Sequence, residues 1–146
     1  MASTIKWFTE EEEVRIVKAI REAEENTSGE IRIHVENNLQ QPPLAEALRV
    51  FKELEMHKTA ARNGVLILLA PAQKSFAILG DEGIHTKVGS DFWQEEKELM
   101  RSFFAREAYA DGLIAAIRQV GKKLKAFFPY QTDDANELSD DLSYGS

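Results

Sequence analysis

Hydrophobic and polar residues follow two different periods along the chain, and these periods predict both helices and strands. Apolar residues recur every three or four positions in four segments, as on the buried stripe of a helix. Three shorter segments are apolar throughout or alternate residue by residue, which is typical of strands. The expected helices are residues 10–26, 44–55, a segment that starts at Ser90 or Asp91 and includes Phe104, and 111–128. The expected strands are residues 31–36, 64–70 and 75–79.

Local signals predict where some helices begin and which faces they bury. Thr9 and Glu12 have the spacing of a capping box, so the first helix is expected to begin beside them. Asp111 is expected to cap the last helix. The residues expected to face inward are Val14, Val17, Ile20 and Ala23 in the first helix, and Leu44, Leu48, Phe51 and Leu54 in the second.

The three strands are expected to form a mixed sheet. The run 64–70 is apolar without alternation, so it is expected at the sheet centre, where helices cover both faces. A short turn at 71–74 separates it from the strand 75–79, and this spacing favours an antiparallel hairpin. Two glycines, Gly80 and Gly83, then bracket the carboxylates of Asp81 and Glu82. The pattern as a whole predicts the α/β class.

Length and composition indicate one domain followed by a polar tail. A chain of 146 residues, 43% of them hydrophobic, can form one substantial core, and we expect this domain to span residues 1–130. Residues 131–146 are rich in Asp and Ser and have only two leucines to bury, so a disordered acidic tail is expected.

Charge and residue usage exclude several classes of function. A net charge of −7 argues against a nucleic-acid partner, which would require a basic surface. The chain has no Cys, which excludes disulfides, thiolate nucleophiles and Cys-based zinc sites. The start of the sequence lacks the pattern of a signal peptide, and no apolar run approaches the roughly 20 residues of a membrane helix. We therefore expect a cytoplasmic protein that does not insert into a membrane.

Four oxygen-bearing side chains form a candidate site for a divalent cation. If the first two strands are parallel and the third is antiparallel, then Glu30, Asn63, Asp81 and Glu82 lie at the same end of the sheet. Calcium and magnesium prefer carboxylate and carbonyl oxygens, and glycine lets main-chain carbonyls turn toward an ion. The alternative is an ordinary solvated turn, because turns favour Asp and Gly for backbone reasons alone.

Three basic side chains near the same end form a candidate anion site. Arg62, His57 and Lys87 are placed to hold a phosphate group together with a neighbouring glycine amide. With the carboxylates they would make a metal-assisted phosphomonoester site, although no side-chain nucleophile stands out. The alternative is ordinary surface charge. The three histidines, His34, His57 and His85, are too scattered for a zinc pair.

Four sequence stretches resemble the TPM-domain family, in its order and at its spacing. They are Thr27-Ser28-Gly29-Glu30-Ile31-Arg32-Ile33, the run from Asn63 to Pro71, Gly80-Asp81-Glu82-Gly83-Ile84, and Tyr109-Ala110-Asp111-Gly112-Leu113. The run from Asn63 to Pro71 is the most specific, and together the stretches cover residues 9–128.

The resemblance implies a three-layer α/β/α sandwich around a small mixed sheet of about four strands. In that family, some members bind calcium or other divalent cations, and plant members are associated with acid-phosphatase activity. Many relatives are exported and membrane-tethered. The resemblance, together with the glycine-flanked carboxylates, implies an accessory or regulatory role beside a membrane-associated protein partner. This chain departs from the family pattern at two places. Arg62 stands where Asp is common, and Ile84-His85 stands where Leu-Glu is common.

Three functions stay open at this point. The first is binding of calcium or magnesium in a loop site, and the second is metal-assisted acid-phosphatase activity. The third is a non-enzymatic protein-interaction module that uses the amphipathic strand or the acidic tail.

Overall fold

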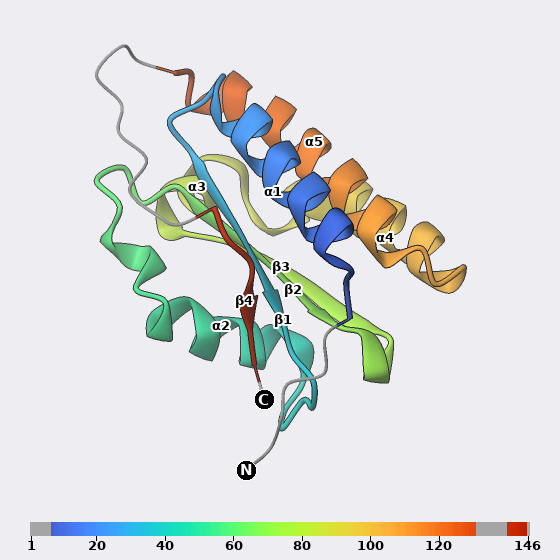
Figure 1. Cartoon of the computed structure of the whole chain (residues 1–146). Coiled ribbons are helices and arrows are strands. Elements are labelled where there is room, and N and C mark those ends of the chain that lie inside the picture. The colour runs from blue at the N-terminus through green and yellow to red at the C-terminus, as the bar shows by residue number, and fades with distance from the viewer. Residues whose placement is uncertain (1–6, 131–139, 146) are drawn as a thin grey trace.

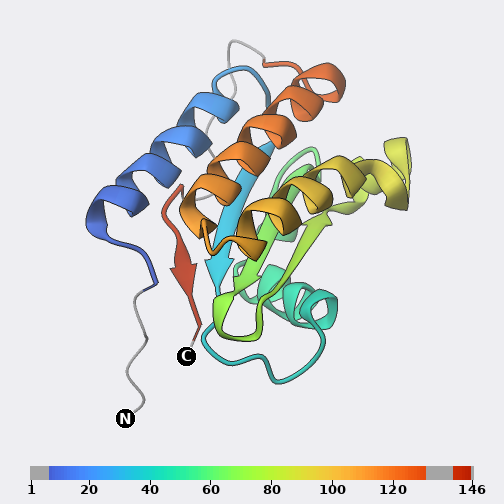
Figure 2. The same ribbon diagram turned by 90° about the vertical axis from the view of Figure 1, so that its right-hand side faces the viewer.

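Helices lie on both faces of a four-stranded mixed sheet, which confirms the expected three-layer α/β/α sandwich (Figures 1 and 2). The computed structural model describes residues 7–130 and 140–145. The strands are β1 (Glu30–Val35), β2 (Gly64–Ala70), β3 (Ser75–Gly80) and β4 (Ser143–Tyr144). The helices are α1 (Glu10–Glu24), α2 (Pro43–Glu53), α3 (Glu82–Val88), α4 (Gln94–Ala105) and α5 (Tyr109–Phe127). Short 3-10 turns are η1 (Met56–Lys58), η2 (Pro71–Gln73) and η3 (Ser90–Trp93).

The sheet contains the predicted antiparallel hairpin, and its first two strands are parallel, which is the condition under which the candidate residues share one end. Its order is β3-β2-β1-β4, with β1 parallel to β2 and β3 antiparallel to β2. Glu30 lies opposite Gly64, and Val65 lies opposite Gly80. The start of β1, the start of β2 and the end of β3 therefore meet at one end of the sheet.

The two faces of the sheet carry separate hydrophobic clusters. Helices α1, α4 and α5 cover one face, and α2 covers the other (Figure 2). All seven residues of β2 are buried, as expected of a strand with both faces covered. Ile67 packs in the larger cluster, whereas Leu66 and Leu68 pack in the smaller one beneath α2.

The inward face of α2 differs from the expected one. Leu44 and Leu48 are 54% and 50% exposed, whereas Ala47 and Val50 are buried. Glu46 takes a place on the inner stripe because its carboxylate accepts hydrogen bonds from the Gln40 amide at 3.3 Å and from Arg49 Nε at 2.5 Å. The helix is thus turned so that two leucines expected in the core lie at the surface.

The first and last helices confirm some expectations and contradict others. Thr9 and Glu12 form the predicted capping box, with Glu12 N donating to Thr9 Oγ1 at 3.1 Å. Ile20 is buried as expected, but Val14 is 67% exposed, and Ile16 and Ala19 complete the buried stripe. Asp111 does not cap α5, since it accepts from Arg15 Nη2 at 2.8 Å.

Part of the expected disordered tail is an ordered strand. Residues 131–139 and 146 lie outside the described residues, but Ser143–Tyr144 form β4 beside β1. Ser143 Oγ lies 2.7 Å from His34 Nδ1, and His34 Nε2 lies 2.7 Å from Glu36 Oε2. The Gly145 amide donates to Val35 O at 2.7 Å. Two residues are too few to show a strand period, so periodicity could not predict this element.

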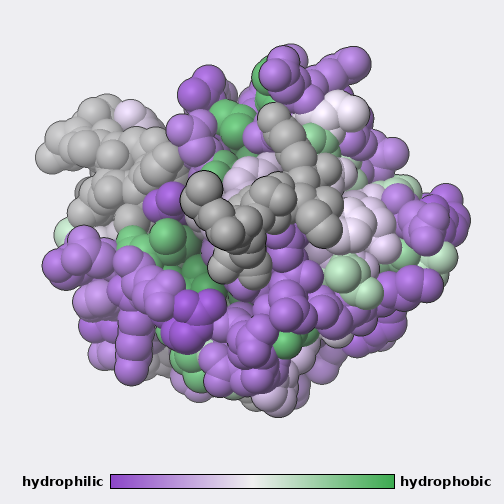
Figure 3. Space-filling view, turned by 60° about the horizontal axis from the view of Figure 1, so that its bottom comes forward, coloured by the Kyte–Doolittle hydropathy of each residue, from purple (hydrophilic) through white to green (hydrophobic). Residues whose placement is uncertain are grey.

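The surface seen in Figure 3 is mostly hydrophilic, and its hydrophobic areas are small and separated. Such a surface is normal for a folded domain. An apolar cavity on it is therefore a candidate for an interaction site.

Candidate functional site

An ion pair between Arg62 and Asp81 occupies the end of the sheet where the candidate residues were expected. Arg62 Nε donates to Asp81 Oδ2 at 2.8 Å, and Arg62 Nη2 donates to Asp81 Oδ1 at 2.9 Å. Asp81 Oδ1 also accepts from the Glu82 amide at 2.7 Å, which caps α3. Both carboxylate oxygens of Asp81 are thus used within the chain. Its side chain is only 5% exposed.

Backbone contacts bring the Arg62 loop against the start of α3. The Gly83 amide donates to Arg62 O at 2.8 Å, and the Asp81 amide donates to Gly64 O at 2.9 Å. A Cβ atom at Gly83 would lie 2.3 Å from Ala61 O and 2.4 Å from Arg62 O, so only glycine fits this close approach. The sequence showed Gly83 as a turn residue, but the contact that requires it is formed between distant segments.

The surroundings of Arg62 favour its charged form. The hydrogen bond to Asp81 raises the pKa of Arg62 above its ordinary value, and the charges of Asp81 and Glu82 act in the same direction. Glu82 Oε2 lies 3.5 Å from Arg62 Nη2, but its side chain is 73% exposed. Arg62 therefore stands between two carboxylates as a permanent cation.

A cavity of about 580 Å³ lies beside the Arg62–Asp81 pair. It is enclosed by the second half of α2, by η1, by the end of β3 and by α3. Its size is typical of ligand pockets. The lining residues are Leu48, Phe51, Lys52, His57, Arg62, Leu79, Gly80, Asp81, Glu82 and His85. We call this cavity the α2–β3 pocket.

The expected cation ligands are divided between the pocket and the interior. Asp81 and Glu82 line the α2–β3 pocket. Asn63 is 1% exposed, and its Nδ2 donates to Ser28 Oγ at 3.3 Å. Glu30 is 3% exposed and lies at the same end of the sheet. It belongs to β1, so β2 stands between it and the end of β3. Within residues 7–130 and 140–145, no group of three or more His, Cys, Asp or Glu side chains could hold a metal ion.

The expected anion ligands are divided as well. His57 and Arg62 line the α2–β3 pocket. Lys87 is not among the lining residues. Its Nζ lies 4.5 Å from the centroid of the Phe128 ring and 3.5 Å from Phe127 O, so it contacts the end of α5 instead.

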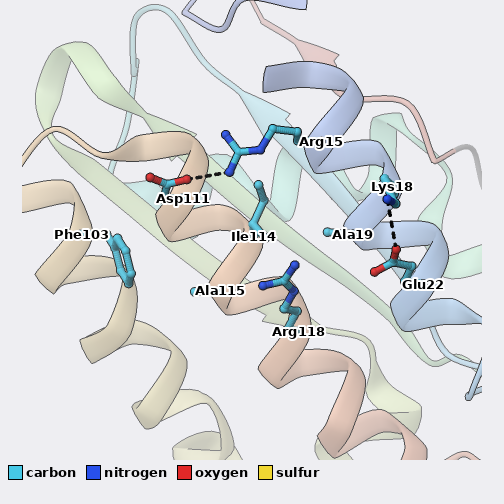
Figure 4. A pocket seen from close by; sticks show the side chains of 9 residues that line it. All are labelled: Arg15, Lys18, Ala19, Glu22, Phe103, Asp111, Ile114, Ala115 and Arg118. Carbon is cyan, nitrogen blue, oxygen red and sulfur yellow. Dashed lines mark hydrogen bonds and ion pairs between the residues drawn. The ribbon is translucent and has the colours of Figure 1, made fainter. Parts of the chain in front are cut away.

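A second cavity, of about 390 Å³, lies on the outer helical face between α1, α4 and α5 (Figure 4). Arg15 pairs with Asp111 at 2.8 Å, and Lys18 lies 3.9 Å from Glu22. Arg118 is the one cation drawn in Figure 4 outside these two pairs. Mutual pairing of exposed charges makes this cavity the weaker candidate for a specific ligand.

One carboxyl group that was not expected from the sequence, that of Glu24 in α1, lies beside the C-terminal segment. Burial raises the pKa of Glu24 to about 9, and a hydrogen bond with Asp140 and the charges of Asp140 and Glu30 act in the same direction. Glu24 Oε2 also accepts from the Ile31 amide at 2.8 Å. The segment before β4 therefore lies against α1, where Arg21 Nε is also 3.6 Å from Asp140 Oδ2. A helical sequence pattern gives no sign of such a contact, because Asp140 is distant in the chain.

Comparison with known proteins decides the family. The sequence model of the TPM domain matches residues 4–123. The chain belongs to the TPM-domain family. A comparison with curated proteins finds no match. In the described part of this TPM domain, no helix is both long and apolar enough to cross a membrane.

Two solved structures share the fold of this TPM domain. One is the NMR structure of the BA42 protein from the psychrophilic bacterium Bizionia argentinensis, with 40% identity and a TM-score of 0.91 over 99% of this chain and 100% of that chain. The other is the N-terminal domain of cg2496 from Corynebacterium glutamicum, with 14% identity and a TM-score of 0.65 over 80% of this chain and 74% of that chain. At that identity, the second structure supports the fold alone.

Proposed function

We propose that this TPM domain is a binding module that takes up a segment of another protein in the α2–β3 pocket. The observation that carries the proposal is the composition of the pocket. Leu48, Phe51 and Leu79 supply apolar surface, while charged side chains stand at its edge. Protein-binding sites commonly combine an apolar centre with a polar rim.

The rotation of α2 supports this function. Leu48 is half exposed at the pocket, and Leu44, one turn earlier, is 54% exposed. Burying such a leucine side chain completely stabilises a complex by about 1.5–3 kcal/mol, before the entropy of association is considered. The two leucines therefore have a function on the surface that they would not have in the core.

Arg62 makes cation binding the less favoured use of the same residues. A calcium or magnesium ion at Asp81 would have to displace a guanidinium that already holds both carboxylate oxygens. Glu82 is the remaining carboxylate in the pocket, and one exposed carboxylate binds a divalent cation weakly. A divalent cofactor and phosphomonoester hydrolysis stay expectations drawn from the family resemblance.

The proposal is tested with peptides selected from a random library displayed on phage against the immobilised full-length chain. We expect peptides with an apolar residue to be enriched, and we expect Leu48→Ser to weaken their binding by at least about tenfold. Val14→Ser is the matched control, because Val14 is an exposed apolar residue on α1, 67% exposed, outside the α2–β3 pocket.

Surface substitutions of this kind change stability little, so both variants should fold. Failure to enrich any peptide, or enrichment of peptides that bind equally to Leu48→Ser and wild type, would refute the proposed function.

A further inference from the structure

The strand β3 forms an edge of the sheet, and its outer side has no strand partner among the described residues. On one side of the sheet, β4 pairs with His34 and Val35 at the end of β1. On the other side, β3 pairs with β2 alone, and no further strand of the described residues pairs with it. Natural proteins protect a free edge with charged residues, proline or a bulge. The sequence of β3, Ser75-Phe76-Ala77-Ile78-Leu79-Gly80, contains no charge and no proline.

The hydrogen-bond phase of the β2–β3 ladder shows which backbone groups face this free edge. The Asp81 amide donates to Gly64 O, and antiparallel neighbours alternate between bonded and non-bonded pairs. Ala77 and Leu79 therefore bond to β2, whereas the N–H and C=O groups of Phe76, Ile78 and Gly80 point outward. Within the described part of the chain, no hydrogen bond to these outward groups is found.

The free edge is continuous with the α2–β3 pocket. A third cavity, of about 220 Å³, lies next to the α2–β3 pocket, and Leu44, Ile78 and Trp93 are among its lining residues. It shares Leu79 and Gly80 with the larger pocket. An added strand would thus place alternate side chains toward cavities that the fold already provides.

Cations outnumber anions at the border of these cavities, with Lys52, Arg62 and Lys97 against Asp81 and Glu82, although the chain has a net charge of −7. Asp81 and Glu82 are the acidic residues that line them, and Asp81 is neutralised by Arg62. Beyond β3, the Arg101 guanidinium carbon lies 5.8 Å from the centroid of the Phe76 ring. The basic residues lining the two cavities are Lys52, His57, Arg62, His85 and Lys97.

We propose that an extended, acidic and apolar segment of a partner protein adds to the β3 edge as a fifth strand, with an apolar side chain in the α2–β3 pocket. This inference rests on the proposed function and specifies its partner. Peptides commonly bind by such strand addition. The charge argues for an acidic partner segment over a second copy of this chain, because a second copy would bring Lys97 and Arg101 against like charges.

The test titrates the ¹⁵N-labelled full-length chain with a capped peptide of alternating Glu and Val. We expect slower amide exchange at Phe76, Ile78 and Gly80, and unchanged exchange at Ala77 and Leu79, whose amides already bond to β2. We expect a peptide with Lys in place of Glu to bind at least about tenfold more weakly at low salt. A peptide N-methylated at every second residue keeps its side chains but should lose the protection of the β3 amides.

Equal binding of the Glu and Lys peptides, or equal protection by the N-methylated peptide, overturns the inference. Protected β3 amides in a dimer of the chain alone overturn it in favour of a second copy. If the Glu peptide shifts only signals of Leu48 and Phe51, strand addition is wrong but the proposed function stands. If peptides selected on phage bind while the Glu peptide causes no change, the acidic strand is again overturned without the proposed function.

Discussion

Substitution of Gly83 by Ala tests how the site is built, because two effects predict opposite changes in the stability of the domain. In an ordinary helix, alanine is more stable than glycine by about 0.5–1 kcal/mol. Here the new Cβ would lie 2.3 Å from Ala61 O and 2.4 Å from Arg62 O. Contacts of a Cβ atom below 3.0 Å are essentially never observed, so α3 or the Arg62 loop has to move by about 0.7 Å.

We expect this movement to reverse the helical gain. Overpacking of a well-packed contact costs about 1–3 kcal/mol, and the shift also strains the hydrogen bond from the Gly83 amide to Arg62 O. For a domain of this size, the melting temperature should fall by roughly 3–9 °C. Thermal unfolding followed by circular dichroism measures the change. Thr86→Ala, at an exposed position of the same helix, is the control and should change stability by less than about 0.5 kcal/mol.

A Gly83→Ala variant as stable as wild type, or more stable, would show that the two segments do not approach so closely. The ion pair of Arg62 with Asp81 would then lack the backbone support described above.

Three further predictions concern other charged and polar contacts. Because the pKa of Glu24 is raised from 4.5 to about 9, its contribution to the free energy of unfolding is present at low pH and is lost as pH rises toward 9. Glu24→Gln should flatten this decline in stability, which is at most about 1.4 kcal/mol per pH unit. Equal pH slopes of wild type and variant in urea unfolding would contradict the prediction. Arg62→Asp puts a third carboxylate beside Asp81 and Glu82, so calorimetry should detect tighter calcium binding than in wild type, and equal affinities would show that Arg62 is no obstacle. Ser143→Ala removes the contact with His34 Nδ1 at a cost of about 0.5–1.5 kcal/mol, and unchanged hydrogen exchange of the Gly145 amide would contradict its role in holding β4.

The sequence was sufficient for three of the four strands, β1, β2 and β3, because their signals are local. The continuous apolar run of β2 and the short connection to β3 predicted a central strand and an antiparallel neighbour, and the structure has both. The strand directions in turn predicted that Glu30, Asn63 and Asp81 share one end of the sheet. Each of these strands could be predicted from residues that are close in the chain, whereas the shared end also required β1 and β2 to be parallel, which periodicity does not report.

The side-chain arrangement of the site depends on contacts between distant segments, and periodicity does not report them. Leu44 and Leu48 have helical spacing with Phe51, but the polar requirement of Glu46 turns α2 and leaves both leucines outside. Likewise, the sequence showed Arg62 and Asp81 as members of two separate candidate sites. Their bidentate pairing, which makes them one unit, follows from the approach of Gly83 to the Arg62 loop.

One NMR experiment tests whether Arg62 stays on Asp81 while the α2–β3 pocket binds a peptide. The Arg62 Nε–H resonance is observed in one labelled sample that receives first calcium and then the peptide of alternating Glu and Val. Because Nε donates to Asp81 Oδ2 at 2.8 Å, displacement of Arg62 by an ion would move this resonance. We expect calcium to leave the Arg62 resonance in place, whereas the peptide should shift signals of Leu48 and Leu79 in the α2–β3 pocket. A calcium-dependent shift of Arg62 and Asp81, with no response of the pocket to peptide, would contradict this expectation.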